Sequence, residues 1–232
     1  MKKKILFMVS SASLIGPLNR KTGNLLTEVA HPYVAFQKQG YDIDIYSVKG
    51  GDAPIDLVEL EDPVNIEFLA GDGPARFKNT GSIEEVSLEG YDAVFVPGGL
   101  APVVDMPDNP TVQRILSTMW ESGKIVSAVC HGPVSLINVK LSDGSWLVDG
   151  KKLTGFSIAE ENGYAKEDVP WELEDRIKEH GAIYTAVDPW QPYSITDGRL
   201  ITGQNPASAQ GVAERVIAAL EASKSSAATQ TI

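Results

Sequence analysis

The chain has 232 residues, of which 43% are hydrophobic, and this fits one large α/β domain with an ample core. Its 20 basic and 31 acidic residues give a net charge of −11. So acidic a surface repels phosphate backbones and anionic lipids, and we expect neither nucleic acid nor a membrane as a partner. The one cysteine cannot form an intramolecular disulfide, and no apolar run is long enough for a signal peptide or a membrane span. We therefore expect a reducing compartment, the cytoplasm.

The N-terminal segment predicts a strand, a helix and a second strand. Residues 4–10 are apolar and β-favouring, and residues 41–48 alternate between apolar and polar. Between them, apolar residues recur at helical spacing over residues 24–39. Pro32 lies inside this helix and removes the hydrogen bond to the carbonyl of Glu28. A bend is therefore expected beside a carboxylate that the pattern places on the buried side.

The middle of the chain has a segment without a regular pattern, followed by clear strand and helix patterns. Residues 55–80 are acidic and rich in Gly and Pro, and we expect irregular structure there, covering the site. Residues 82–86 predict a short helical turn. Strands are predicted over residues 92–96 and 124–129, with an amphipathic helix between them over residues 110–122.

The C-terminal part continues the pattern with an insertion. We predict a short helix over residues 134–139, an inserted hairpin over 143–156 and a helix over 170–180. These are followed by a strand over residues 183–187, a hairpin with an Asp-Gly turn over 194–202 and a final helix over 205–222. No linker divides the chain. We expect a single domain over residues 1–222 and a disordered tail over residues 223–232, whose residues are small and polar.

Strands that alternate with helices predict a mostly parallel sheet sandwiched between helices. In such a sheet the ligand crevice lies at the carboxyl ends of the strands. Cys130 follows one predicted strand, Gly98 and Gly99 follow a second, and the helix that bears Glu28 begins after a third. These residues should therefore meet at one edge of the sheet, which predicts a site there.

Cys130 is the candidate nucleophile. An apolar strand runs directly into Cys130, His131 and a Gly-Pro break, which predicts an abrupt turn from strand to helix. A helix N-terminus and a nearby imidazolium both favour the thiolate. A lone cysteine is most often a small buried hydrophobe, but a core strand rarely ends in a polar ring beside its thiol.

Carbonyl chemistry needs a base and an oxyanion hole besides the nucleophile. His131 can serve as the base if a third group orients its ring. The backbone N–H groups of Gly99 and of His131 could hold a developing oxyanion. From the residues alone the orienting group stays open between three carboxylates, which are Glu28, Glu160 and Glu161.

Five ordered motifs make the chain resemble the ThiJ/PfpI superfamily, and within it the branch of stress-linked chaperones and glutathione-independent glyoxalases (glyoxalase III type). They cover residues 22–32, 96–99, 128–133, 153–156 and 200–208, and the match extends from about residue 4 to about residue 220. The resemblance implies a flavodoxin-like fold of the class I glutamine amidotransferase type, with an added β-hairpin, and a homodimer.

The resemblance also implies site residues and a reaction. Cys130 is the implied catalytic cysteine, with His131 beside it and Glu28 hydrogen-bonded to the thiol. The acid that orients the histidine falls on Glu161, with Glu160 as the alternative. The thiolate adds to a 2-oxoaldehyde such as methylglyoxal, Glu28 or His131 moves a proton through an enediol, and a thioester is hydrolysed to D-lactate or its homologue. No cofactor is implied, because the redox change is internal.

Some members of this branch bind a metal through two histidines and a carboxylate. Only His31, His131 and His180 are present here, and His131 is already assigned, so we expect no metal. We expect His31 to satisfy a buried hydrogen bond. Two other readings stay open: a cysteine-dependent amidase, peptidase or deglycase, and a holdase chaperone or redox sensor that uses Cys130 as a signal.

Overall fold

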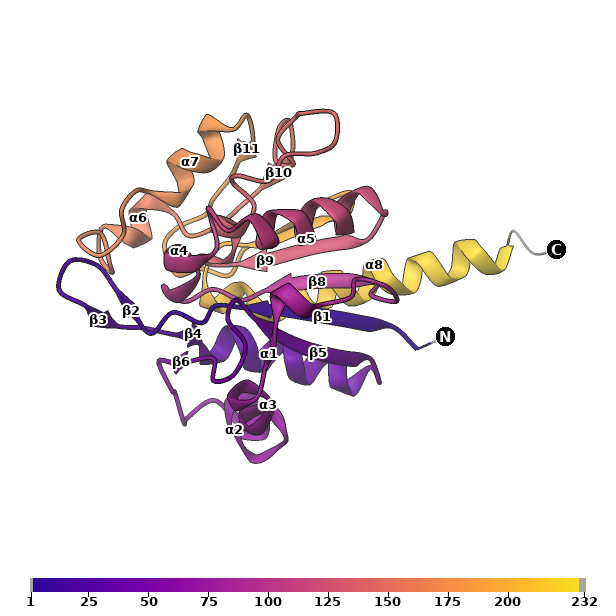
Figure 1. Cartoon of the computed structure of the whole chain (residues 1–232), viewed down its shortest axis with the longest axis horizontal. Coiled ribbons are helices and arrows are strands. Elements are labelled where there is room, and N and C mark those ends of the chain that lie inside the picture. Colours follow the sequence, from indigo (N-terminus) through magenta and orange to yellow (C-terminus); the bar gives the residue numbers. More distant parts are fainter. Residues whose placement is uncertain (1, 230–232) are drawn as a thin grey trace.

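The computed structural model describes residues 2–229, with side chains as far as Ser223. Within this part a seven-stranded sheet has the order β12-β13-β9-β8-β1-β5-β7 (Figure 1). Only β12 and β13 pair antiparallel; every other neighbouring pair is parallel. The strands are β1 (Lys4–Val9), β5 (Asp42–Ser47), β7 (Gly81–Ser82), β8 (Ala93–Val96), β9 (Ile125–Val129), β12 (Ser194–Asp197) and β13 (Leu200–Gly203). The predicted flavodoxin-like sheet is confirmed, and the hairpin at its edge is β12–β13.

Helices cover both faces of this sheet. The helix α1 packs against α8, and α5 packs against β8 and β9; in Figure 1 α5 lies in front of the sheet and α8 passes behind it. The α-helices are α1 (Leu26–Lys38), α2 (Pro63–Ala70), α3 (Gly73–Lys78), α4 (Ala101–Asp105), α5 (Pro110–Glu121), α6 (Ile158–Glu161), α7 (Leu173–Glu179) and α8 (Ala209–Thr229). The 3-10 turns are η1 (Ile83–Glu85), η2 (Gly132–Ser135) and η3 (Pro206–Ser208).

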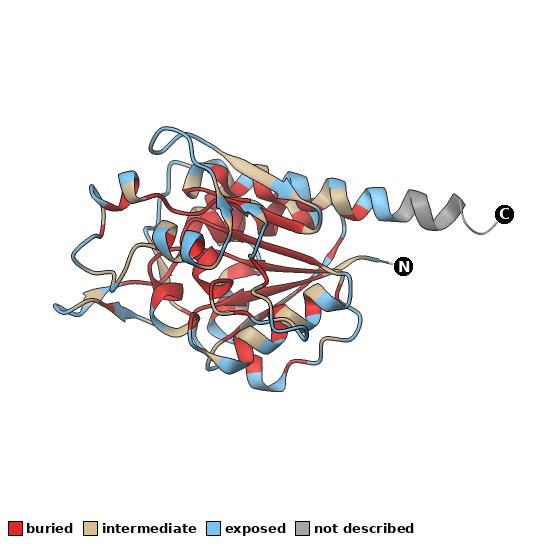
Figure 2. Cartoon of the chain, turned by 90° about the horizontal axis from the view of Figure 1, so that it is seen from above, coloured by how far each residue is buried: buried red, intermediate tan, exposed pale blue. Residues whose placement is uncertain are grey.

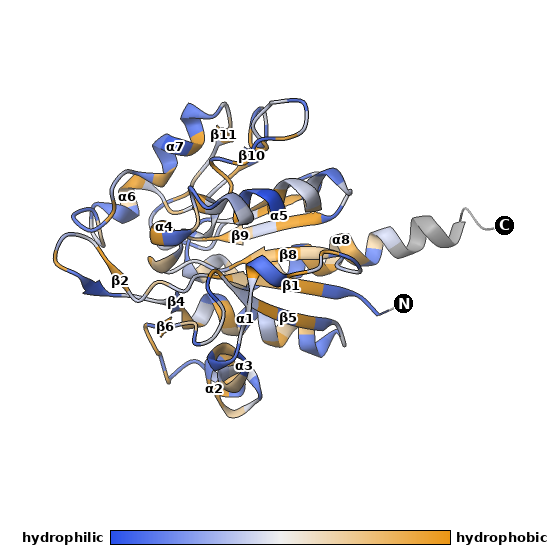
Figure 3. Cartoon of the chain, viewed as in Figure 1, coloured by the Kyte–Doolittle hydropathy of each residue, from blue (hydrophilic) through white to orange (hydrophobic). Residues whose placement is uncertain are grey.

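The central strands are buried on both faces, as a parallel sheet between helices requires. Every residue of β8 and β9 is buried, and so is β1 after Lys4. Figure 2 shows these strands as a continuous buried layer, and Figure 3 shows that they are apolar, whereas much of α7 is hydrophilic. The sheet is therefore a rigid base, and its carboxyl edge is where polar side chains can gather.

Three pairs of two-residue strands form outside the main sheet. The strands β2 (Leu14–Ile15) and β3 (Arg20–Lys21) make a small antiparallel hairpin. The strands β4 (Asn24–Leu25) and β6 (Ile55–Asp56) pair in parallel, and so do β10 (Lys152–Leu153) and β11 (Ile183–Tyr184). The predicted hairpin over residues 143–156 is therefore wrong, because β10 pairs with a segment about thirty residues later instead of folding back.

The prediction of irregular structure over residues 55–80 is also wrong in part. The segment contains α2 and α3, and α2 begins with Pro63 after Asp62, whose carboxylate accepts hydrogen bonds from two backbone amides of its first turn. The helix packs on α1 and buries Phe68 beside Tyr33. Conversely, the apolar helix predicted over residues 134–139 is only the 3-10 turn η2.

The remaining predicted elements form with small shifts of their ends. The helix α1 runs through Pro32 as one helix, and α8 continues to Thr229, past the predicted end near residue 222. The single domain over residues 1–222 and the disordered tail over residues 223–232 stay predictions, and residues 230–232 lie outside the described part. Among residues 2–229, no helix is both long enough and apolar enough to span a membrane.

Candidate active site

Cys130 sits at a strained turn at the carboxyl end of β9. Its φ of 61° lies in the left-handed region, which costs a residue with a side chain roughly 1–2 kcal/mol. The turn is held from both sides, because its N–H donates to the carbonyl of Gly203 at 2.9 Å and its carbonyl accepts from the N–H of Phe156 at 2.8 Å. The chain then enters η2 at once, with Gly132 packed so closely that a Cβ would lie 2.4 Å from the carbonyl oxygen of Val96. The predicted strand-to-helix turn is therefore present.

Glu28 lies in the first turn of α1 and is fully buried. Its Oε2 accepts a hydrogen bond of 2.7 Å from the N–H of Gly98, whereas Oε1 has no nitrogen or oxygen partner and the carboxyl interacts with the Cys130 thiol. Burial raises the pKa of Glu28 to about 8, although the hydrogen bonds with Cys130 and Gly98 oppose the shift. At neutral pH this carboxyl is therefore mostly protonated.

The Cys130 thiol and the Glu28 carboxyl form one coupled pair. Burial raises the pKa of the Cys130 thiol, and a negative charge on Glu28 would raise it further. That charge is mostly absent at neutral pH, because Glu28 then holds its proton. A neutral carboxyl donates a hydrogen bond to the sulfur instead of repelling it, and so favours the thiolate. Because the pKa of each group is raised, the pair binds its protons tightly, and the form that has lost one proton keeps a single proton that oxygen and sulfur can exchange.

Two backbone N–H groups point at the same sulfur. Hydrogen bonds from Gly99 and His131 lower the pKa of the Cys130 thiol, in opposition to burial. These are the two amides that the sequence predicted as an oxyanion hole. They converge because Gly99 follows β8 and His131 follows β9, and these strands are parallel neighbours.

His131 connects the thiol to a buried carboxylate. Its Nδ1 lies 3.5 Å from the sulfur of Cys130, and its Nε2 lies 2.7 Å from Oε2 of Glu161. Both side chains of the His131–Glu161 pair are at least 98% buried. A hydrogen bond from Nε2–H to the carboxylate leaves Nδ1 unprotonated toward the sulfur, which is the tautomer that a base for this thiol needs. The ring of Phe156 packs on the imidazole, with 4.3 Å between ring centroids.

Glu160 faces away from this group. It forms a capping box with Ser157, and its carboxylate accepts hydrogen bonds from the side chains of Gln204 and Asn205 and from the N–H of Trp190. The carboxylate that contacts His131 is therefore that of Glu161. Glu28 contacts the thiol and not the imidazole, so each of the three candidate carboxylates has a separate place.

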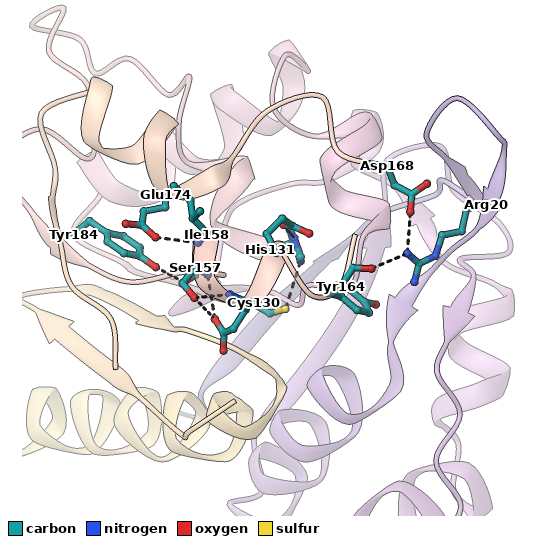
Figure 4. Close-up of polar contacts among 12 residues, drawn as sticks. Arg20, Cys130, His131, Ser157, Ile158, Tyr164, Asp168, Glu174 and Tyr184 are labelled. Carbon is teal, nitrogen blue, oxygen red and sulfur yellow. Dashed lines mark hydrogen bonds and ion pairs between the residues drawn. The ribbon is translucent and has the colours of Figure 1, made fainter. Parts of the chain in front are cut away.

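Three residues around this group were not predicted from the sequence: Tyr164, Trp190 and Arg20. The aromatic residues Tyr164 and Trp190 lie beside Phe156, with ring centroids 5.7 and 5.6 Å from it. Figure 4 shows Tyr164 between the Cys130–His131 pair and Arg20 of β3, which pairs with Asp168 at 2.9 Å. All three missed residues lie outside the main sheet, where no periodic pattern marks them.

His31 lies on α1, and its Nε2 pairs with Oδ2 of Asp62 at 2.8 Å. The predicted hydrogen bond is present, although the side chain is 18% exposed and so not fully buried. His180 hydrogen-bonds the carbonyl of Arg176 through Nδ1.

The fold and the site define a class of protein: a parallel α/β protein whose cysteine lies on a left-handed turn, between a buried glutamate and a histidine held by a second glutamate. The chain belongs to the DJ-1/PfpI family, whose model matches residues 23–219. This confirms the family that the sequence motifs indicated.

Several curated proteins and solved structures match the chain over nearly their whole length. The chain is 35% identical to the glutathione-independent glyoxalase HSP31 of Saccharomyces cerevisiae over 95% of this chain and 98% of that protein. It is 32% identical to glyoxalase 3 of Candida albicans over 95% of this chain and 99% of that protein. Among solved structures, glyoxalase III from Candida albicans superposes with a TM-score of 0.84 at 31% identity, covering 94% of this chain and 97% of that one. The Rapid Encystment Protein of Francisella tularensis reaches 0.90 at 36% identity, covering 94% and 99%.

Proposed function

We propose that the protein is a glutathione-independent glyoxalase that converts methylglyoxal or a related 2-oxoaldehyde to a 2-hydroxy acid. The observation that carries the proposal is the arrangement around one sulfur. A protonated Glu28 lies on one side of Cys130, and His131, held by Glu161, lies on the other. The names of the full-length relatives support the same reaction.

The first step is addition to the aldehyde. The Cys130 thiolate forms a bond to C1, and the aldehyde π-electrons move to oxygen. The N–H groups of Gly99 and His131, which point at the sulfur, are within reach of an oxygen on the adjacent carbon. Glu28 then gives its proton to this oxygen, which yields a neutral hemithioacetal and a carboxylate.

The second step moves hydrogen from C1 to C2. The Glu28 carboxylate removes the C1 proton, and the electron pair of the C–H bond forms an enediolate with negative charge on the C2 oxygen. Glu28 returns the proton to C2, and the C1 hydroxyl proton passes to the C2 oxygen, which leaves a thioester of a 2-hydroxy acid. C1 is oxidised and C2 is reduced, so the electrons balance within the substrate.

The third step is hydrolysis. Nδ1 of His131 removes a proton from water, the oxygen attacks the thioester carbonyl, and the Cys130 thiolate leaves. Glu161 stabilises the imidazolium that forms, as a buried carboxylate does in hydrolytic triads. The product acid supplies the proton that restores Glu28, the imidazolium of His131 gives its proton to the product carboxylate, and the sum is 2-oxoaldehyde plus water giving 2-hydroxy acid.

The test is lactate formation from methylglyoxal by purified protein without glutathione or added metal. We expect turnover in the parent protein and none above background in Cys130→Ala and Glu28→Gln. A parent protein that makes no lactate, while Cys130 still reacts with iodoacetamide at neutral pH, would contradict the proposal. Release of free amine from a glycated peptide by that same preparation would then favour the deglycase alternative.

The proposal includes a cytoplasmic homodimer, which the motif resemblance supports. Sedimentation velocity at micromolar concentration tests the dimer, and a monomer there would contradict it.

A further inference from the structure

Tyr164 presents a hydroxyl with no hydrogen-bond partner among the described residues, close to the proposed nucleophile. The residue lies three positions after the end of α6, and its backbone N–H donates to the carbonyl of Glu161 at 3.0 Å. The segment that orients His131 therefore also carries this phenol. The mechanism proposed above leaves its hydroxyl unused.

The ring of Tyr164 is held from several sides. Phe156 and Trp190 meet it edge-on, with centroids 5.7 and 6.1 Å away. The guanidinium of Arg20 lies over its face at 5.1 Å and is itself fixed by Asp168. A ring clamped in this way offers its hydroxyl with little loss of side-chain entropy when a ligand binds.

The hydroxyl also remains protonated under working conditions. Burial raises the pKa of Tyr164, and the nearby Cys130 adds to the shift, while Arg20 opposes it. A phenol with a raised pKa is a hydrogen-bond donor throughout the neutral range and does not give up its proton.

The proposed reaction develops negative charge on two oxygens in turn. The amides of Gly99 and His131 serve the oxygen on C1, because they converge on the sulfur that bonds to C1. The oxygen on C2 lies one carbon farther from the sulfur and becomes negative in the enediolate. No group assigned so far stabilises that charge.

We propose that the Tyr164 hydroxyl donates a hydrogen bond to the C2 oxygen of a 2-oxoaldehyde bound at Cys130, and that it stabilises the enediolate. The inference rests on the proposed glyoxalase function. The phenol keeps its proton throughout, so the proton balance of the reaction is unchanged. Tyr164 is then a catalytic residue, and it contributes to the reaction only when the substrate has a second carbonyl beside the aldehyde.

The test is Tyr164→Phe, which removes only the hydroxyl and leaves the ring in its aromatic surroundings. Loss of one preorganised donor to an oxyanion lowers kcat by roughly 100-fold. We expect this fall in kcat with methylglyoxal and a smaller, several-fold rise in KM, because the hydrogen bond already forms to the neutral C2 oxygen and strengthens when charge develops in the enediolate. Tyr46→Phe in β5, whose hydroxyl also lacks a hydrogen-bond partner among the described residues, is the matched control and should keep the parent rate.

A second readout does not depend on turnover. Methylglyoxal should slow alkylation of Cys130 by iodoacetamide, because the hemithioacetal occupies the sulfur. Alkylation without methylglyoxal should proceed at the same rate in the parent protein and in Tyr164→Phe. In Tyr164→Phe, protection should need a several-fold higher methylglyoxal concentration, because the ground-state hydrogen bond to the C2 oxygen is lost.

The outcomes separate the two proposals. Parent turnover with an unchanged kcat in Tyr164→Phe overturns the role of Tyr164 and leaves the glyoxalase function standing. A parent protein without turnover overturns the glyoxalase function. In that case weaker protection in Tyr164→Phe still supports a hydrogen bond to the dicarbonyl, and equal protection rejects it.

Discussion

Glu160 and Glu161 are consecutive residues of α6, yet their carboxylates belong to separate networks. Glu161 contacts the imidazole of His131 at 2.7 Å, and Glu160 accepts from the hydroxyl of Ser157, also at 2.7 Å. Consecutive side chains of a helix point about 100° apart, so one turn can serve the chemistry and the architecture at once. The two residues should therefore respond in opposite ways to the same substitution.

Glu161→Gln should reduce activity more than stability. The amide oxygen can still accept from Nε2–H of His131, but the negative charge that stabilises the imidazolium is lost. We expect kcat for lactate formation to fall at least 10-fold, with a melting temperature within about 3 °C of the parent protein. An unchanged kcat would show that Glu161 does not assist His131.

Glu160→Gln should reduce stability more than the chemical step. The carboxylate accepts from Gln204, Asn205 and the N–H of Trp190, and an amide nitrogen in its place would face donors. An unsatisfied buried group of this kind costs about 2–3 kcal/mol, or roughly 5–10 °C in melting temperature for a chain of this length. Calorimetry of Glu160→Gln and Glu161→Gln under the same conditions tests this difference in stability. Equal melting temperatures of the two variants would contradict it.

Glu28 should make stability fall as pH rises. Its pKa is about 8 in the folded protein, against 4.5 for the reference carboxyl, so the folded state binds this proton more tightly. The stabilisation is fully present below about pH 4.5 and is lost as pH rises through about 8.

Differential scanning fluorimetry of the parent protein and Glu28→Gln across pH 5 to 9 measures this effect, because glutamine cannot titrate. We expect the melting temperature of the parent to fall by roughly 10 °C relative to the variant over that range. A constant difference between the two proteins would show that Glu28 does not hold a proton in the folded state.

Glu28→Gln should separate thiol reactivity from turnover. Gly98 donates to the side-chain oxygen at this position, so the glutamine oxygen takes that place and its amide N–H faces the sulfur of Cys130. The amide imitates the protonated carboxyl as a donor but cannot move a proton. We expect iodoacetamide to alkylate Cys130 within about 3-fold of the parent rate at pH 7, while lactate formation falls at least 1000-fold. Parallel losses of both would mean that Glu28 acts only on the thiol.

Trp190 should influence the preference among 2-oxoaldehydes with different substituents. Its φ of 65° is strained, its backbone N–H is held by Glu160, and its side chain, 49% exposed, lies against Phe156 and Tyr164. An aromatic contact adds about 1 kcal/mol, so Trp190→Ala should lower kcat/KM for phenylglyoxal about 5-fold relative to methylglyoxal. Trp146→Ala, which alters a tryptophan packed on His180, is the control and should leave that ratio unchanged.

Much of the fold, and the part of the site formed by Cys130, Gly98 and Glu28, could be predicted from the pattern of apolar residues along the chain. Parallel strands force their carboxyl ends to one edge, so the meeting of Cys130, Gly98 and Glu28 could be predicted from the order of elements alone. The choice of Glu161 over Glu160 required the motif resemblance, because a shift of one residue turns the side chain to another face. The different directions of the Glu160 and Glu161 side chains then follow from the rotation of about 100° between consecutive residues of α6.

The parts that escaped prediction depend on contacts between distant segments. The parallel pairing of β10 with β11 involves only two residues in each strand, too few to leave an alternating pattern. The helix α2 did leave a signal, Asp62 followed by Pro63, but its acidic and Gly-rich surroundings concealed it. Tyr164 and Trp190 meet Phe156 only through tertiary packing, so nothing near them in the chain marks them as part of the site.

The close packing of backbone around the sulfur decides where the enzyme can be redesigned. A Cβ on Gly98 would lie 2.6 Å from Oε2 of Glu28, and one on Gly132 would lie 2.4 Å from a backbone oxygen of β8, so neither position admits a side chain without a shift. The aromatic side chains of Phe156, Tyr164 and Trp190 gather beside His131 instead, and Tyr164 and Trp190 are partly exposed. A mutant library aimed at new aldehydes should therefore vary Tyr164 and Trp190 and leave the glycines fixed, since a side chain at either glycine would displace the groups around the sulfur of Cys130.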